Sequence, residues 1–508
     1  MAPVDRYAAV RETHSGVVVL IGDCALKVKK PVDLGFLDFR SRSQREEACR
    51  REVELNRRLA PDVYRGVATL SAADGAVGEP VVVMRRLPDE RRLTTLVAAG
   101  HPLADVVARL ARKVAALHAA SRRAPDIDSE GRRDAVRSRW QANFRQARPF
   151  HGVVLDSGDA NEIEHLAEDF LAGREALFDR RIADGRIVDG HGDLICDDIF
   201  CLPDGPRILD CLEFDDRLRY VDGLDDIAFL AMDLEHLGAD ELAASLVDRY
   251  AEYAADPVPP ALLHHYLAYR AFVRAKISCL GGTHGDVTHG DVIHGDVIHG
   301  DVTARNAARS YTALALKHLR AGRVRLILIG GLPAAGKSTV AGLLADRLGA
   351  VLLSSDHIRK ETAGISPVIC ATGAYRHGMY NDTHTDRTYL ELIRSAEDLL
   401  GLGETVVLDA SWTQARLRAL AAGSATRAHA EFIGVECRAP STLRRARLIA
   451  RTDDASDPDP QVADRMASDA DPWPDAIRLS TARSAGTALE ELLPQLDREL
   501  QTSERGTA

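Results

Sequence analysis

The chain has 508 residues, which is too long for one hydrophobic core, because cores stop growing at about 250–300 residues and longer chains divide into domains. Its apolar fraction of 45% and charged fraction of 28% are typical of a folded globular protein. The formal net charge of -11 argues against a general binder of nucleic acid or membrane surfaces, since such proteins present a basic field to their partner. We expect two or three folded domains and no stable nucleic-acid or membrane partner.

The cysteines and the apolar runs predict the compartment. The eight cysteines are scattered without a CxxC pair, so neither a disulfide framework nor a zinc finger is supported. Cys196, Cys201 and Cys211 are expected to be buried thiols, with a metal site that includes His191 as the alternative. The first residues are charged where a signal peptide is apolar, and no run approaches the ~18–20 apolar residues of a membrane span. These features predict a cytoplasmic location.

The first part of the chain is expected to form a small β-rich lobe followed by a helical lobe. β-Branched residues cluster in 15–30 around the turn pair Gly22-Asp23, which predicts a hairpin, and residues 80–84 predict a further strand. Helical patterns cover 44–59, 103–121 and 160–180, and short strands follow within 186–215. We predict a small lobe over about 1–90 and a large lobe over about 91–320.

Residues 284–303 form a tandem pentapeptide repeat, HGDVT-HGDVI-HGDVI-HGDVT. A period of five matches neither one face of a helix nor one side of a strand. We interpret the repeat as an expanded surface loop, and weak binding of a divalent metal through its His and Asp side chains is the alternative. A helix is predicted over 304–320, and Gly322 is expected to mark its end and the domain boundary.

Beyond Gly322, apolar strands alternate with helical patterns, which predicts a parallel α/β domain over 322–505. A motif of the form GxxxxGK[ST] stands between the first strand and the first helix of this domain. It comprises Gly331, Leu332, Pro333, Ala334, Ala335, Gly336, Lys337 and Ser338, followed by Thr339. The amides of such a loop wrap the phosphates of ATP, Lys337 supplies charge to the terminal phosphates, and Ser338 supplies a hydroxyl to Mg²⁺.

Further candidates follow the other strands of this domain. Asp356 is a candidate general base, and capping of the next helix is its other possible role. Asp409 ends an apolar strand, as a Walker B metal ligand does. Arg447 and Arg451 lie four apart on a predicted helix, where they either close over the transferring phosphoryl group or form a solvated basic face.

With GLPAAGKST and SSDHIRK as its most specific parts, the segment 324–455 resembles a group of P-loop kinases with AAA-type ATP-binding domains. The group includes gluconate kinases, the kinase part of phage polynucleotide kinase, chloramphenicol phosphotransferase and zeta toxins. The resemblance implies that Asp356 is the general base, that Arg359 contacts the acceptor or a phosphate, and that the segment of Arg447 and Arg451 is a lid. It implies the reaction and not the acceptor, which varies within the group.

A second kinase pattern occurs earlier in the chain. His191-Gly192-Asp193 follows a short strand, Asp198 comes five residues after Asp193, and Asp210 ends another strand. Asp193 is expected to deprotonate an acceptor hydroxyl, and Asp198 and Asp210 are expected to hold Mg²⁺. Upstream, Lys27 and Glu52 are the expected lysine–glutamate pair, with Lys29 and Lys30 as alternatives to Lys27.

These residues, with the stretches ALKVKKPVDLGFLDF, HGDL and ILDCLEFDDRLRYVD, resemble the aminoglycoside phosphotransferase family over most of 14–320. The resemblance extends especially to long bacterial members of the family in which such a domain precedes a P-loop kinase. It implies that Lys27 contacts ATP phosphates and that Glu52 holds this lysine. Asp198 departs from the family pattern, which usually has Asn there, so three carboxylates, Asp193, Asp198 and Asp210, would require more compensation by metal.

The fold class predicted is α+β and α/β: a protein-kinase-like two-lobed domain over 1–320 followed by a P-loop domain over 322–505. The function predicted is ATP- and Mg²⁺-dependent transfer of a phosphoryl group to a hydroxyl, or an amine, of a small molecule. One alternative is an ATP-binding regulatory or toxin-like protein with a degenerate first kinase domain. Another is a polynucleotide 5′-kinase, which the acidic balance disfavours.

Overall fold

The computed structural model describes residues 7–12, 15–33, 38–71, 78–257, 259–281, 302–362, 382–450 and 460–503. The chain divides into two compact units. The first unit comprises the chain up to His165, Phe178–Val258 and Leu263–Leu319. The second unit comprises Leu166–Leu177, Pro259–Leu262 and the chain from Arg320 onward. The domain limits of 320 and 322 stay a prediction. Residues 284–301 of the pentapeptide repeat lie outside the described residues.

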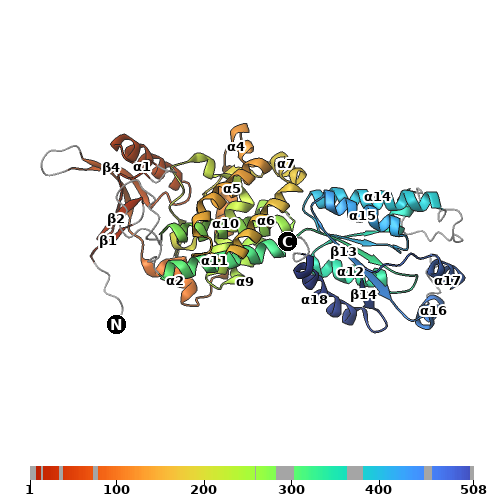
Figure 1. Cartoon of the computed structure of the whole chain (residues 1–508). Coiled ribbons are helices and arrows are strands. Elements are labelled where there is room, and N and C mark those ends of the chain that lie inside the picture. Colours follow the sequence, from red (N-terminus) through yellow and green to blue (C-terminus); the bar gives the residue numbers. More distant parts are fainter. Residues whose placement is uncertain are drawn as a thin grey trace. The chain divides into compact units, whose positions relative to one another are not determined.

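The small lobe of the first unit is an antiparallel sheet covered by one helix (Figure 1). The strand order is β1-β2-β3-β5-β4, with β1 Ala8–Glu12, β2 Gly16–Ile21, β3 Cys24–Lys29, β4 Tyr64–Leu70 and β5 Glu79–Arg85. The predicted hairpin and the strand at 80–84 are confirmed as β2–β3 and β5, whereas β1 and β4 were not predicted. Helix α1, Arg42–Asn56, starts with a capping box of Ser41 and Gln44 and packs Cys49 and Val53 into the core of the lobe.

The rest of the first part of the chain is mainly helical. Its helices are α2 Leu93–Ala98, α3 Ala104–Ala120, α4 Pro125–Glu130, α5 Arg133–Ala147, α6 Ser157–Ala172, α7 Glu175–Ala183, α8 Gly223–His236, α9 Asp240–Ala254, α10 Pro260–Gly281 and α11 Val302–Ala321. Two small antiparallel pairs join β6 Ile187–Asp189 to β9 Tyr220–Asp222 and β7 Ile199–Leu202 to β8 Gly205–Ile208. The single helix predicted over 160–180 is instead two helices, because a glycine at position 173 interrupts it.

The second unit contains a parallel sheet with helices on both faces (Figure 1). The strand order is β11-β12-β10-β13-β14, with β10 Arg325–Gly330, β11 Val351–Ser354, β12 Val406–Asp409, β13 Glu431–Arg438 and β14 Ile477–Ser480. The helices are α12 Lys337–Leu348, α13 Ser355–Thr362, α14 Asp382–Gly401, α15 Ala415–Arg427, α16 Ser441–Ala450, α17 Pro460–Ser468 and α18 Ala485–Ser503. Four strands were predicted, and β14 was not. The predicted fold class is confirmed.

Cys196, Cys201 and Cys211 are buried free thiols, as predicted. None of the helices in the described residues combines the length and the apolar character that a membrane crossing requires.

A buried arginine connects helices α7, α8 and α9 of the first unit. Arg181 of α7 binds Asp222 at 2.6 Å and Asp256 at 2.5 Å, and its side chain is only 5% exposed. Asp222 also accepts a hydrogen bond from the main-chain N–H of Leu224 at the start of α8. The guanidinium group therefore neutralises two carboxylates at the point where α7, α8 and the end of α9 meet.

The substitution Arg181→Met should lower the free energy of unfolding of the first unit by about 3–5 kcal/mol, because two buried carboxylates lose their cation. Urea unfolding followed by circular dichroism measures this. Arg180→Met is the matched control, since Arg180 is 64% exposed and its ion pair with Asp184 is 3.7 Å long, so it should change stability by less than about 1 kcal/mol. Equal losses in the two variants would contradict this interpretation of the Arg181 cluster.

Candidate active sites

Two lysines of strand β3 converge on one carboxylate of helix α1. Lys27 and Lys29 are two residues apart and therefore point to the same face of the sheet. Lys27 Nζ lies 3.0 Å from Glu52 Oε1, and Lys29 Nζ lies 2.6 Å from Glu52 Oε2. Lys27 also pairs with Asp210, and Lys29 pairs with Glu213. The expected Lys27–Glu52 pair is thus present, and a second pair through Lys29 accompanies it.

The charges in this network offset the effect of burial. Burial alone would lower the pKa of the Lys27 ammonium group, but the carboxylates of Asp210 and Glu52 raise that pKa well above its usual value. Lys30, the third lysine considered from sequence, pairs instead with Glu12 at 2.6 Å. Lys27 is therefore the one of the three that connects Glu52 to Asp210.

The loop that carries Asp193 is held by a buried carboxylate of helix α8. Asp226 accepts hydrogen bonds from the main-chain N–H groups of His191 at 2.7 Å and Gly192 at 2.9 Å, and lies 3.0 Å from His118 Nε2. Burial would raise the pKa of Asp226, but the hydrogen bond and charge of His118 hold that pKa below its usual value. Gly192 has a φ of 86°, a conformation that suits glycine. Asp226 therefore holds the two consecutive peptide groups that lead into Gly192, just before Asp193.

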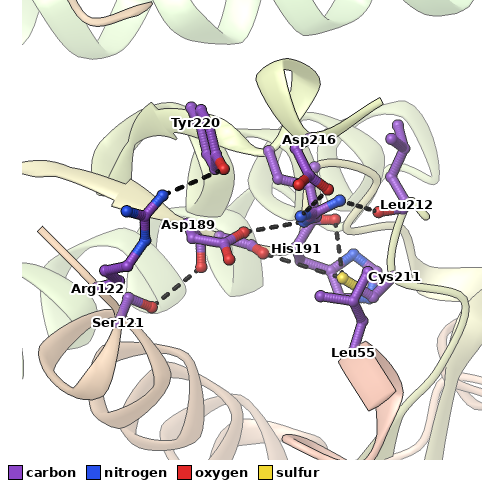
Figure 2. Close-up of polar contacts among 12 residues, drawn as sticks. Leu55, Ser121, Arg122, Asp189, His191, Cys211, Leu212, Asp216 and Tyr220 are labelled. Carbon is purple, nitrogen blue, oxygen red and sulfur yellow. Dashed lines mark hydrogen bonds and ion pairs between the residues drawn. The ribbon is translucent and has the colours of Figure 1, made fainter. Parts of the chain in front are cut away.

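Arg219 joins the strand before this loop to the segment after Asp210. Its guanidinium group donates to Asp189 Oδ1 at 2.9 Å and to the carbonyl of Leu212 at 2.7 Å, and the side chain is fully buried. Ser121 Oγ donates to the carbonyl of Asp189 at 3.0 Å. Figure 2 shows Asp189, His191 and Cys211 gathered at this point. Strand β6, which precedes the HGD loop, and the segment Asp210–Leu212 are thus held together by the Arg219 side chain.

Three carboxylates predicted from sequence affect one another's ionisation. Burial raises the pKa of Asp193 to about 6, against the opposing effect of Arg274. Burial, together with the carboxylates of Asp210 and Asp193, raises the pKa of Asp198 well above its usual range. For Asp210, burial would raise the pKa, but Lys27 and Lys29 hold it below its usual value. Asp198 and Asp210 offer the hard oxygen atoms that Mg²⁺ prefers and are the residues that would hold it, although the described residues contain no group of three or more His, Cys, Asp or Glu side chains placed to hold a metal ion.

Two arginines of helix α10 approach the same loop and were not predicted. Arg270 binds Asp225 at 2.7 Å and donates to the carbonyl of Gly192 at 3.2 Å. Arg274 follows one helical turn later on the same face and lowers the pKa of Asp193. Nothing in the local sequence connects α10 with the loop, which is about 80 residues away, so only packing could bring these arginines to it.

In the second unit, the predicted P-loop connects β10 to α12. Gly331 has a φ of 134°, and a Cβ added there would lie 2.5 Å from the carbonyl oxygen of Cys437. Gly336 has a φ of 85° and immediately precedes the helix. Lys337 Nζ donates to the carbonyl of Leu332 at 3.3 Å, so the side chain folds back over its own loop. The loop has the glycine positions and the helix N-terminus that bind phosphates.

The parallel register brings the other candidates to the same sheet edge. Asp409, the last residue of β12, is paired with Ile329 of β10 on one side and with Ser354 of β11 on the other. Burial raises the pKa of Asp409, and a hydrogen bond from Ser338 opposes that rise. Ser338 and Asp409 are therefore neighbours, and their hydroxyl and carboxylate oxygens fit Mg²⁺.

Asp356 lies at this edge with the arginine predicted to act beside it. Arg359 Nη1 donates to Asp356 Oδ1 at 2.8 Å. The helix α13 begins at Ser355, and the main-chain N–H of Asp356 donates to Ser354 Oγ at 3.3 Å. The alternative prediction that Asp356 caps this helix is therefore wrong. The side chain of Ser354 accepts the hydrogen bond at the helix start, and Asp356 lies within the first turn.

Arg447 reaches the P-loop from helix α16. Its guanidinium group donates to the carbonyl of Ala334 at 3.3 Å and to the carbonyl of Thr481 at 2.7 Å. Thr481 Oγ1 in turn donates to the carbonyl of Ala335 at 2.5 Å. Thr481 was missed in sequence, although the alternation of Ile477 and Leu479 before it is a strand signal. Arg451, the other predicted arginine, lies outside the described residues.

The chain matches known proteins over both parts. A family model described as an AAA domain matches residues 326–473. The uncharacterized proteins Rv2004c of Mycobacterium tuberculosis and Mb2027c of Mycobacterium bovis are each 41% identical to the chain over 487 residues, which is 95% of this chain and 95% of each relative. The predicted P-loop kinase resemblance of the C-terminal part agrees with the AAA-domain match.

The chain is also similar to solved structures of two kinases. A gluconokinase from Sinorhizobium meliloti is 17% identical, with a TM-score of 0.27, and the match covers 36% of this chain and 98% of that chain. A choline/ethanolamine kinase family protein from Mesorhizobium loti is 13% identical, with a TM-score of 0.36, and the match covers 63% of this chain and 94% of that chain.

The raised pKa of Asp193 predicts a pH-dependent gain of stability in Asp193→Asn. Because the folded protein holds a proton on Asp193 up to a pH of about 6 and the unfolded chain loses it near 4, stability falls as pH rises between these values. In magnesium-free buffer at pH 7.5, the variant should be more stable than the parent by about 2 kcal/mol. The difference should vanish below a pH of about 4.

Urea unfolding between pH 3.5 and 8 measures this difference. Asp179→Asn, at an exposed position of the same unit, is the matched control and should stay within about 0.5 kcal/mol of the parent at every pH. A constant effect of Asp193→Asn across the pH range would show that burial does not hold the carboxyl protonated.

Proposed function

The chain belongs to the same protein family as Rv2004c of Mycobacterium tuberculosis, and we propose that it is an ATP-dependent phosphotransferase acting on a hydroxyl, or an amine, of a small molecule. The observation that carries this proposal is the convergence at one sheet edge of the P-loop, Ser338 with Asp409, and Asp356 with Arg359. A phosphate cradle, hard oxygen ligands and a carboxylate base are the groups that phosphoryl transfer needs.

In the second unit, each of these groups has a distinct role in the proposal. The P-loop amides and Lys337 bind the ATP phosphates, and Arg447, which donates to the carbonyl of Ala334 in the loop, adds positive charge near the transferring group. Asp356 accepts the proton of the acceptor group, and Arg359 orients that carboxylate and contacts the acceptor. Mg²⁺, held by Ser338 and Asp409, supplies neutralisation of the phosphate charge.

The first unit supports a second site with the same chemistry. Lys27, held by Glu52, contacts the ATP phosphates, while Asp198 and Asp210 hold Mg²⁺. Asp193 is the base, and with a pKa of about 6 it is mostly ionised at neutral pH while remaining basic enough to take a proton. We assign the first module to residues 1–320 and the second to 322–505.

Two other functions make different predictions. A regulatory or toxin-like protein would bind ATP at one or both modules and show no turnover with any small acceptor. A polynucleotide 5′-kinase would bind oligonucleotides in a salt-sensitive manner, which the net charge of -11 disfavours.

ATP consumption across sugars, polyols, nucleosides, amino sugars and aminoglycosides tests the proposal on the intact protein. An acceptor should stimulate ADP formation, and Lys337→Ala or Asp193→Ala should reduce the stimulated rate by at least about 100-fold, depending on which module uses that acceptor. Arg347→Ala is the matched control for the second module, because Arg347 is an exposed cation at the far end of α12, and it should leave the rate unchanged.

The assay also separates the proposal from its alternatives. Loss of the rate in one variant assigns the reaction to that module and identifies the acceptor class. ATP binding without stimulation by any acceptor would contradict the phosphotransferase proposal and favour the regulatory function.

A further inference from the structure

Two side chains outside the predicted site hold the main chain at Asp210. The N–H of Asp210 donates to the hydroxyl oxygen of Tyr64 at 3.2 Å, and the next N–H, that of Cys211, donates to Asn56 Oδ1 at 2.9 Å. Asn56 is fully buried and Tyr64 is 2% exposed. Consecutive N–H groups of the metal-ligand segment are therefore bound by side chains rather than by strand partners.

The backbone at Asp210 has a conformation that needs such support. Its φ is 62°, in the left-handed region that residues with a Cβ rarely adopt. A strained conformation persists only where its surroundings hold it, and such residues concentrate at functional sites. The hydrogen bonds to Tyr64 and Asn56 act on the peptide groups on either side of the Asp210 Cα, so they determine the direction in which its carboxylate leaves the main chain.

The same helix that carries Glu52 also carries one of these side chains. Asn56 follows Glu52 by one turn of α1, and its Nδ2 donates to the carbonyl of Glu52 at 2.9 Å. Glu52 binds Lys27, and Lys27 binds the carboxylate of Asp210. Burial raises the pKa of Tyr64 well above its usual value, so the phenol keeps its proton and remains an uncharged acceptor beside these charges. Main chain and side chain of Asp210 are thus both held from the small lobe.

We propose that Asn56 and Tyr64 are positioning residues of the first module, which orient Asp210 for Mg²⁺ through hydrogen bonds to the main-chain N–H groups of Asp210 and Cys211. The inference rests on the proposal that this module binds Mg²⁺ and ATP. It adds that the gain in ATP affinity caused by Mg²⁺ depends on Asn56 and Tyr64, which themselves contact neither ATP nor Mg²⁺. The ATP affinity that remains without Mg²⁺ depends instead on the Lys27–Glu52 pair.

The test measures ATP affinity of the full-length Lys337→Ala protein, in which the second site is disabled, by titration calorimetry with Mg²⁺ and with EDTA. Adding Tyr64→Phe keeps the ring and removes only the oxygen that accepts from Asp210. The dissociation constant with Mg²⁺ should rise roughly tenfold, since a buried N–H loses its acceptor, and the constant in EDTA should stay within about twofold. Asn56→Leu should likewise raise the dissociation constant with Mg²⁺ and leave the constant in EDTA nearly unchanged.

Tyr266→Phe is the matched control. Tyr266 is also buried, and its hydroxyl donates to Asp222 at 3.3 Å in the same unit, away from the Asp210 segment. It should leave the dissociation constants unchanged in both conditions. Thermal unfolding of every variant establishes that the comparison is made between folded proteins.

Each remaining outcome decides against the inference. Equal weakening with Mg²⁺ and with EDTA in both test variants would make Asn56 and Tyr64 merely structural, and unchanged binding would show that Asp210 does not depend on them. If Lys337→Ala alone shows no Mg²⁺-dependent ATP binding, the proposed function of the first module fails, and the positioning role fails with it. Failure of the proposed function is thus seen in the Lys337→Ala protein itself, whereas failure of the positioning role alone is seen only after Asn56 or Tyr64 is replaced.

Discussion

The carboxylate of Glu52 has no exposed surface and lies between two lysine ammonium groups. A charged carboxylate removed from water is strongly destabilising unless cations lie beside it, so helix α1 can pack on the small-lobe sheet only with Lys27 and Lys29 directed toward it. The lysines, in turn, bind Asp210 and Glu213, which follow the HGD loop in the chain. One buried charge therefore connects the sheet, the helix and the segment that carries Asp210 in the first candidate site.

The two candidate sites are assembled by different physical means. In the first unit, side-chain ion pairs and the buried carboxylate Asp226 place a loop and a short segment whose own secondary structure is slight. In the second unit, the parallel sheet does most of this work, because its register places the carboxyl ends of β10, β11 and β12 at one edge. The first site therefore depends on charge compensation and the second mainly on backbone geometry.

Backbone strain occurs at both sites. Asp210 has a φ of 62° and Ala334, inside the P-loop, has a φ of 57°. Trp412, three residues after Asp409, has a φ of 50°. Such conformations are unfavourable for residues with a Cβ, and the surrounding contacts must supply the free energy that maintains them. The carbonyl of Ala334 accepts from Arg447, and the N–H of Trp412 donates to the hydroxyl of Tyr389, so side chains from other elements support both.

Adjacent residues alone specify those parts of this protein whose chemistry depends on short motifs. The P-loop between β10 and α12, the HGD loop after β6, and most helices and central strands follow from local motifs and hydrophobic periodicity. Strands β1 and β4 are largely exposed and carry too little periodicity to be recognised, while the alternation in β14 spans only four residues. The preference for Lys27 over Lys29 and Lys30 rested only on its Ala-x-Lys setting, because all three lysines stand within four residues on or beside one strand.

Which distant residues come into contact, and how strongly each charged group is removed from water, depends on the tertiary structure. The Lys29–Glu213 pair, the hydrogen bonds of Asn56 and Tyr64, and the contacts of Arg447 with Thr481 join residues far apart in the chain. The pKa of Asp193, raised to about 6, likewise reflects burial and not the identity of its sequence neighbours. The physical reason is that backbone conformation responds to a few adjacent residues, whereas ion pairing and solvation depend on every group that packing brings within reach.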